Sequence, residues 1–221
     1  MSRASRPYLP SAAETSACSG RHHYPKPTDA YPRPRCQPAP TRVACRYPSY
    51  LAKHRHVNCP DLSAMLHEKE VTFNNLYSGF VEYCEHIDQP LHLCGLSLGG
   101  NLALNYAIDY PEKIESLVLL GTQYNMPKLL LKLQNSIFRF LPKATFHELG
   151  FKKNDFIQLT NSMLHLNFTS YLMNISCTTL IVCGEKDYAN KNASKALAER
   201  IPKAELQLIP SAGHEVNVQA P

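Results

Sequence analysis

A glycine-rich turn in the middle of the chain stands between a short apolar run and a helical pattern. Residues 91–94 are mostly apolar, and Gly95-Leu-Ser-Leu-Gly-Gly100 follows them directly. Residues 101–110 then carry apolar side chains at helical spacing and end before Pro111. The predicted order is strand, sharp turn, helix, with Ser97 at the centre of the turn. Small flanking residues let the helix approach the strand closely and give the turn the backbone freedom it needs.

The same alternation continues on both sides of this turn. The apolar patterns predict a short strand end near residues 56–62, a helix over 72–84 and buried strands over 114–120 and 178–183. They also predict a helix over 193–200 and an alternating strand over 205–209. Strands that alternate with helices favour an α/β fold with a doubly wound, mostly parallel sheet.

A long stretch interrupts this rhythm and divides the predicted sheet domain. We expect residues 124–176 to form a helical cap insertion, and residues 51–123 and 177–221 to form the core. The apolar side chains of the insertion either line a substrate pocket or pack the cap itself. They are Leu130, Leu131, Leu133, Ile137, Phe138, Phe140 and Leu141.

The first 50 residues differ chemically from the rest of the chain. They hold nine of the seventeen prolines, no Phe or Ile, and a charge balance of +6 that exceeds the chain's net charge of +5. Such a segment buries too little apolar surface to offset its ordering entropy, so disorder is predicted. Because the folded part is then nearly neutral, composition argues against nucleic-acid binding.

Several further features bear on compartment and partners. No apolar stretch approaches the roughly 18 residues of a membrane span, and residues 1–30 lack the apolar run of a secretory signal. The eight cysteines form no CxxC pair and no metal-ligand spacing. We therefore expect a cytoplasmic protein with reduced thiols, no metal and no membrane span, whose oligomeric state is left open.

Three polar residues follow three strand ends in a suggestive order. Gly95-x-Ser97-x-Gly99 matches the nucleophile elbow, in which a serine hydroxyl is exposed on a strained turn. Asp187 follows the strand that ends near residue 183, with Glu185 as the competing carboxylate, and His214 follows the last strand. Serine, acid and histidine in this order predict a catalytic triad.

Residues from about 56 to the end resemble the α/β-hydrolase superfamily, most closely its small bacterial esterase-like members. The resemblance implies acyl transfer to water from a small carboxylic ester, with Ser97 as nucleophile, His214 as proton carrier, Asp187 holding the imidazole, and the Leu98 backbone N–H as an oxyanion donor. It implies no cofactor, and it leaves thioester, amide and carbon–carbon bond hydrolysis open. The matching pieces are Cys-Pro-Asp-Leu at 59–62, Gly-Leu-Ser-Leu-Gly-Gly at 95–100, Asp-Tyr-Pro-Glu-Lys at 109–113, Leu-Val-Leu-Leu-Gly at 117–121, Cys-Gly-Glu-Lys-Asp at 183–187 and Ala-Gly-His-Glu at 212–215.

The sequence departs from this family in its first quarter. We find no early strand with a His-Gly loop, which supplies the second oxyanion N–H in the family, before residue 56, and we expect the closing helix that the family normally adds at the end to be missing. We expect residues 1–48 to derive from a misread frame, a fusion or an incomplete gene, with lowered stability as the result. The alternative function is noncatalytic: an incomplete hydrolase-like protein that acts through its basic arm, which includes Pro7-Tyr-Leu-Pro10.

Overall fold

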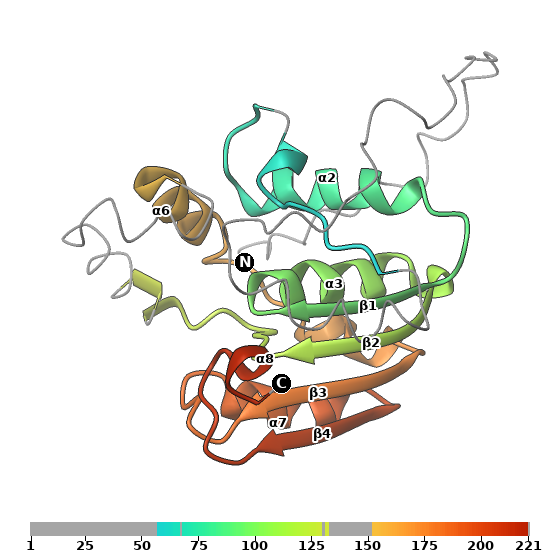
Figure 1. Cartoon of the computed structure of the whole chain (residues 1–221), viewed down its shortest axis with the longest axis vertical. Helices are drawn as coiled ribbons and strands as arrows, with labels where there is room; N and C mark the ends of the chain where they lie inside the picture. The colour runs from blue at the N-terminus through green and yellow to red at the C-terminus, as the bar shows by residue number, and fades with distance from the viewer. Residues whose placement is uncertain (1–56, 67, 130, 133–151, 221) are drawn as a thin grey trace, which may run out of the picture.

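A parallel sheet of four strands organises the described part of the molecule. The computed structural model describes residues 57–66, 68–129, 131–132 and 152–220. Strands β1 (Leu91–Leu96), β2 (Ile114–Leu120), β3 (Thr178–Gly184) and β4 (Ala204–Ile209) lie in the order β1-β2-β3-β4, and every neighbouring pair is parallel (Figure 1). This confirms the predicted α/β class. The strands predicted at 114–120, 178–183 and 205–209 are found within one residue of those bounds.

Two crossover helices cover one face of this sheet. Helix α3 (Leu98–Asp109) connects β1 to β2, and α7 (Lys191–Arg200) connects β3 to β4. Both connections step to the next strand in the same direction, so right-handed crossovers place both helices on the same face. On that face Leu117, Leu119 and Ile181 are fully buried, whereas Val118 between them on β2 is only half-buried.

Helix α2 (Phe73–Glu85) packs beside α3, on the side of β1 away from β2 (Figure 1). Its N-cap residue is Thr72, whose hydroxyl accepts the backbone N–H of Asn75 at 3.2 Å. Phe80 meets Tyr106 of α3 edge-on with ring centroids 5.7 Å apart. The apolar face that predicted this helix is the buried one: Phe73, Leu76, Tyr77, Phe80 and Cys84.

The strand end expected near residues 56–62 is a wrong prediction for the residues described there. Residues 57–61 form no strand, and a 3-10 turn, η1 (Ala64–Leu66), follows. The carboxylate of Asp61 accepts the backbone N–H of Ser63 at 2.9 Å and its hydroxyl at 2.7 Å. This local Asx-type turn bends the chain immediately after Pro60.

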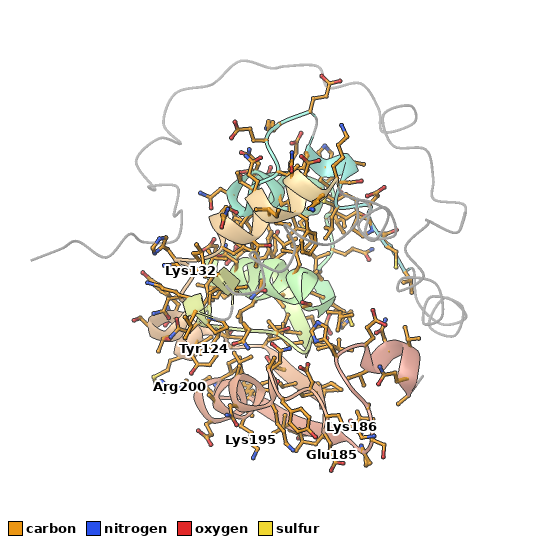
Figure 2. All side chains as sticks on the ribbon, turned by 90° about the vertical axis from the view of Figure 1, so that its left-hand side faces the viewer. Tyr124, Lys132, Glu185, Lys186, Lys195 and Arg200 are labelled. Carbon is orange, nitrogen blue, oxygen red and sulfur yellow. The ribbon has the colours of Figure 1, made fainter. Side chains whose placement is uncertain are left out.

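The described ends of the expected cap insertion are tied to the core. They contain α6 (Lys153–Ser162) and η3 (Thr169–Asn174), and the Ser162 hydroxyl accepts the first backbone N–H of α2 at 2.8 Å. The Arg200 guanidinium at the end of α7 lies 5.9 Å from the ring centre of Tyr124 (Figure 2). Of the seven candidate pocket residues, only the half-buried Leu131 lies within the described residues, so their role and the domain division stay predictions.

Two short elements complete the path of the chain. The 3-10 turn η2 (Pro111–Lys113) leads into β2, and α8 (Val216–Gln219) follows β4 at the end of the sheet where the strand arrows point (Figure 1). No helix in the described ranges is both long and apolar enough to cross a bilayer. The Pro-rich segment 1–50 lies outside the described residues.

Candidate active site

Ser97 lies on a strained turn between β1 and α3. Its backbone angles are φ 52° and ψ −111°, in a region that residues with a side chain rarely adopt. Its backbone N–H donates to the carbonyl of Leu120 on β2 at 2.9 Å, which holds the turn against the neighbouring strand. A Cβ on Gly95 would collide with the Gly99 carbonyl. The close approach of strand and helix that the sequence predicted is therefore present at Gly95.

Asp187 and His214 form a hydrogen-bonded pair. The His214 Nδ1 lies 2.8 Å from Asp187 Oδ2. The Asp187 side chain is 5% exposed, whereas that of His214 is 41% exposed. A carboxylate only accepts hydrogen bonds, so this contact requires the proton on Nδ1 and leaves Nε2 as the basic nitrogen of the neutral ring.

Backbone hydrogen bonds hold together the two loops that carry this pair. The Lys186 N–H donates to the Ala212 carbonyl at 2.8 Å, and the Glu185 N–H donates to the Ile209 carbonyl at 3.0 Å. On the histidine loop, the Gly213 N–H donates to Oε1 of Gln219 on α8 at 2.5 Å. The loops after β3 and β4 are therefore fixed relative to each other close to the Asp187–His214 contact.

Gly121 places the histidine ring next to the turn that carries Ser97. It has φ 50°, and a Cβ built on it would lie 2.9 Å from Nδ1 of His214 and 3.1 Å from Oδ2 of Asp187. Leu120, the residue before it, pairs with Leu96, the residue before Ser97. The imidazole therefore lies over the end of β2, one strand from Ser97. Within the described residues, no hydrogen bond joins the Ser97 hydroxyl to His214.

The two other sequence candidates have different surroundings. Glu185 is exposed, and its Oε2 accepts a long hydrogen bond of 3.4 Å from the Ser211 N–H. It lies at the surface beside Lys186 (Figure 2). The geometry thus favours Asp187 as the partner of the histidine.

Leu98 is the first residue of α3, so its N–H has no acceptor within the helix and is available to an anion at the turn.

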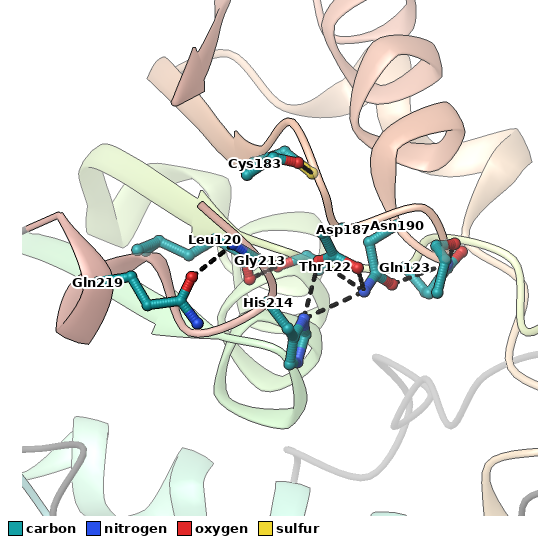
Figure 3. A network of polar contacts seen from close by, with 11 residues as sticks. Leu120, Thr122, Gln123, Cys183, Asp187, Asn190, Gly213, His214 and Gln219 are labelled. Carbon is teal, nitrogen blue, oxygen red and sulfur yellow. Dashed lines mark hydrogen bonds and ion pairs between the residues drawn. The ribbon is translucent and has the colours of Figure 1, made fainter. Parts of the chain in front are cut away.

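Two polar residues that the sequence analysis did not single out belong to this cluster. Nδ2 of Asn190 lies 2.9 Å from each oxygen of the Asp187 carboxylate, and Nε2 of Gln123 lies 2.9 Å from Oδ1 of Asn190 (Figure 3). Neither residue lies in a recognisable motif. Gly121, by contrast, could have been found from the sequence, because it is the last residue of the Leu-Val-Leu-Leu-Gly run that resembles the family.

A separate hollow of about 260 Å³ lies at the other end of β1. It is lined by residues that include Glu85, Ile87, Pro90 and Lys113. None of the candidate residues lines it, so it takes no part in the site.

Known proteins are similar to this chain in sequence and in fold. The chain is 23% identical over 200 aligned residues to a Bacillus subtilis protein named putative 2-succinyl-6-hydroxy-2,4-cyclohexadiene-1-carboxylate synthase, with 73% of each chain covered. Its fold is similar to that of MGS-M2, an α/β hydrolase from a deep-sea metagenome library, with TM-score 0.59, 23% identity and 70% and 69% of the two chains covered. MenH from S. aureus gives TM-score 0.58 at 20% identity, with 69% and 72% covered.

The family model described as the alpha/beta hydrolase fold matches residues 48–167, which is more than half of the 221-residue chain. The strand, turn and helix around Ser97 lie inside this match, and the likeness to solved structures shows the same fold over about two thirds of the chain. The chain belongs to the α/β-hydrolase family of enzymes.

Proposed function

We propose that Ser97, His214 and Asp187 form the catalytic triad of a serine hydrolase that cleaves a small carboxylic ester. The observation that carries the proposal is the convergence of three loops at one sheet edge. The Asp187–His214 pair, joined at 2.8 Å, lies over Gly121 at the end of β2, and Ser97 lies at the end of the adjacent β1 on a nucleophile-type turn.

The proposed reaction runs through an acyl-enzyme. The Ser97 hydroxyl attacks the ester carbonyl while its proton passes to Nε2 of His214, and the negative charge that develops on the carbonyl oxygen faces the Leu98 N–H. The imidazolium then protonates the leaving alcohol. Water attacks the acyl-serine with His214 as base, which regenerates the free serine. Asp187 stabilises the imidazolium and fixes the ring.

The reaction needs no metal or organic cofactor under this proposal, because the imidazole activates the nucleophile. We place it in the cytoplasm with a small-molecule substrate. Four cysteines in the described residues, Cys84, Cys94, Cys177 and Cys183, are free thiols, which suits a reducing compartment.

The first test is hydrolysis of a short-chain chromogenic ester by the purified protein and three variants, Ser97→Ala, His214→Gln and Asp187→Asn. Asp187→Asn is expected to lower kcat by about 10⁴-fold, and Ser97→Ala and His214→Gln by about 10⁶-fold. Ser78→Ala is the matched control, because Ser78 is an exposed serine on α2. A folded wild-type protein without Ser97-dependent turnover would contradict the proposal and favour the noncatalytic alternative.

A second candidate reaction comes from the name of the Bacillus subtilis relative, a putative synthase of 2-succinyl-6-hydroxy-2,4-cyclohexadiene-1-carboxylate. At 23% identity the name carries less weight than the site geometry, so the ester assay comes first. Formation of that carboxylate by the wild-type protein and not by Ser97→Ala, without ester turnover, would favour the synthase reaction.

A further inference from the structure

The carboxylate of Asp187 is buried, and in the described part of the chain no lysine or arginine forms an ion pair with it. The residue is 6% exposed, and its ion-pair partner is His214. A buried carboxylate needs donors for both oxygens, and without them it turns toward solvent or takes up a proton. The donor that reaches both oxygens is the side-chain amide of Asn190.

We propose that Asn190, oriented by Gln123, is a positioning residue: it fixes the Asp187 carboxylate against His214 and thereby keeps the histidine proton on Nδ1. This inference rests on the proposed triad. It assigns a role in the same site to two residues outside the triad, which lie 67 positions apart in the sequence.

The orientation of the Asn190 amide follows from its hydrogen-bond partners. Nε2 of Gln123 donates to the Ala189 carbonyl at 2.8 Å, which can only accept, so this end of Gln123 is the donor. The same Nε2 lies 2.9 Å from Oδ1 of Asn190, so this oxygen accepts a hydrogen bond from Gln123. The other end of the Asn190 amide, Nδ2, must then be the donor that faces Asp187.

The backbone holds Asn190 in place for this contact. Asn190 is the N-cap residue of α7 and is 9% exposed. Its N–H donates to the Asp187 carbonyl at 3.2 Å, and its own carbonyl accepts the Ser194 N–H at 2.8 Å. The side-chain and backbone bonds together close a small ring between Asp187 and Asn190, which leaves the carboxylate little freedom to rotate.

Asn190 Nδ2 also lies 3.1 Å from Nδ1 of His214. With the proton on Nδ1 both nitrogens are donors, and this contact is not a hydrogen bond. In the other tautomer Asn190 could donate to Nδ1, but the carboxylate would then face a lone pair at 2.8 Å. The charge-assisted bond to Asp187 is the stronger of the two, so it sets the tautomer as long as the carboxylate stays in place.

The test compares Asn190→Leu, Gln123→Leu and the double variant in the full chain, with Asn192→Leu as control. Leucine has a similar size to asparagine but no donor, and Asn192 is an exposed residue of α7. The readout is the ¹⁵N spectrum of histidine-labelled protein, in which the His214 signals are identified by their absence from His214→Gln. In the wild-type protein the neutral His214 ring is expected in the Nδ1–H form. In Asn190→Leu the same ring is expected as a mixture of the two tautomers.

Kinetics provide the second readout, again in the same four variants. Asn190→Leu is expected to lower kcat for an ester by on the order of 10-fold or more with KM unchanged, because substrate binding does not involve the amide. Gln123→Leu should give a smaller loss. The double variant should match Asn190→Leu alone, because Gln123 acts only through Asn190.

The outcomes separate this inference from the proposed function. A single Nδ1–H tautomer together with unchanged kcat in Asn190→Leu, or additive losses in the double variant, would overturn the positioning role. A tautomer shift in Asn190→Leu alongside a wild-type protein without Ser97-dependent hydrolysis would uphold the positioning role and reject the ester proposal. Gln123 is only half-buried, so Gln123→Leu gives the same readouts if Asn190→Leu does not fold.

Discussion

The three glycines around Ser97 meet different surroundings. A Cβ on Gly95 would collide with the Gly99 carbonyl, and one on Gly100 would collide with the hydroxyl of Thr122. A Cβ on Gly99 would meet no atom within 4 Å. The Gly-x-Ser-x-Gly pattern predicted the turn, but it could not tell which glycine the packing requires.

Alanine substitutions should therefore affect stability in opposite directions. Gly99→Ala is expected to raise the free energy of unfolding by about 0.4–1 kcal/mol, because Gly99 lies in α3 with a helical backbone and alanine restricts the unfolded chain. Gly100→Ala should lower it by about 1–3 kcal/mol, because the buried Thr122 must shift. Urea unfolding measures both, and equal effects of the two substitutions would contradict this assignment.

At the scale of elements, a polar cluster lies between α2 and α3. The Tyr77 hydroxyl donates a hydrogen bond to Asp109, and Nδ2 of Asn105 donates to the same carboxylate oxygen at 3.0 Å. Burial raises the pKa of Asp109 above its ordinary value, although both hydrogen bonds oppose this shift. The cluster joins the two helices at the cost of a partly buried carboxylate.

This cluster predicts a pH dependence of stability. Because the folded-state pKa of Asp109 lies above that of the unfolded chain, the native state holds the proton more tightly. The contribution of Asp109 is thus fully present below about pH 4 and is lost as pH rises through the folded pKa. The Asp109→Asn side chain keeps an oxygen that accepts the hydrogen bond from Tyr77, but it cannot ionise. Its contribution to stability is therefore not lost as pH rises.

The measurement is the free energy of unfolding in urea at several pH values between about 4 and 7. Relative to the wild type, Asp109→Asn should gain stability as pH rises across this range. Asp88→Asn, at an exposed aspartate, is the control and should run parallel to the wild type. An Asp109→Asn curve that also runs parallel to the wild type would show that Asp109 has no raised pKa.

The elements that could be predicted from the sequence are those with strong apolar periodicity. The α2 face from Phe73 to Cys84 and the buried runs of β2 and β3 were identified correctly, because burial on a sheet or helix face leaves a direct pattern. The strand end expected near residues 56–62 is not found in the described residues 57–61, and a turn in which the Ser63 hydroxyl donates to Asp61 follows them. Apolar patterns carry no information on such local polar contacts.

At the scale of the whole molecule, the candidate site is assembled from loops that follow three successive strands and from the turn after β1. Parallel strands bring their carboxyl ends to one edge, so the positions of Ser97, Asp187 and His214 after three predicted strand ends favoured their lying at the same edge. The Gln123–Asn190 contact could not be predicted, because it depends on how the loop after β2 meets the start of α7. Side-chain amides far apart in sequence leave no periodic signal.

The most direct test of the triad is covalent labelling by a serine-reactive phosphonate, followed by identification of the labelled peptide by mass spectrometry. An activated Ser97 should be labelled in the wild-type protein and in Ser78→Ala. Labelling should be lost in Ser97→Ala and strongly slowed in His214→Gln, because the hydroxyl alone is a weak nucleophile. A folded wild-type protein that takes up no phosphonate at Ser97, or takes it up equally well without His214, would contradict the account.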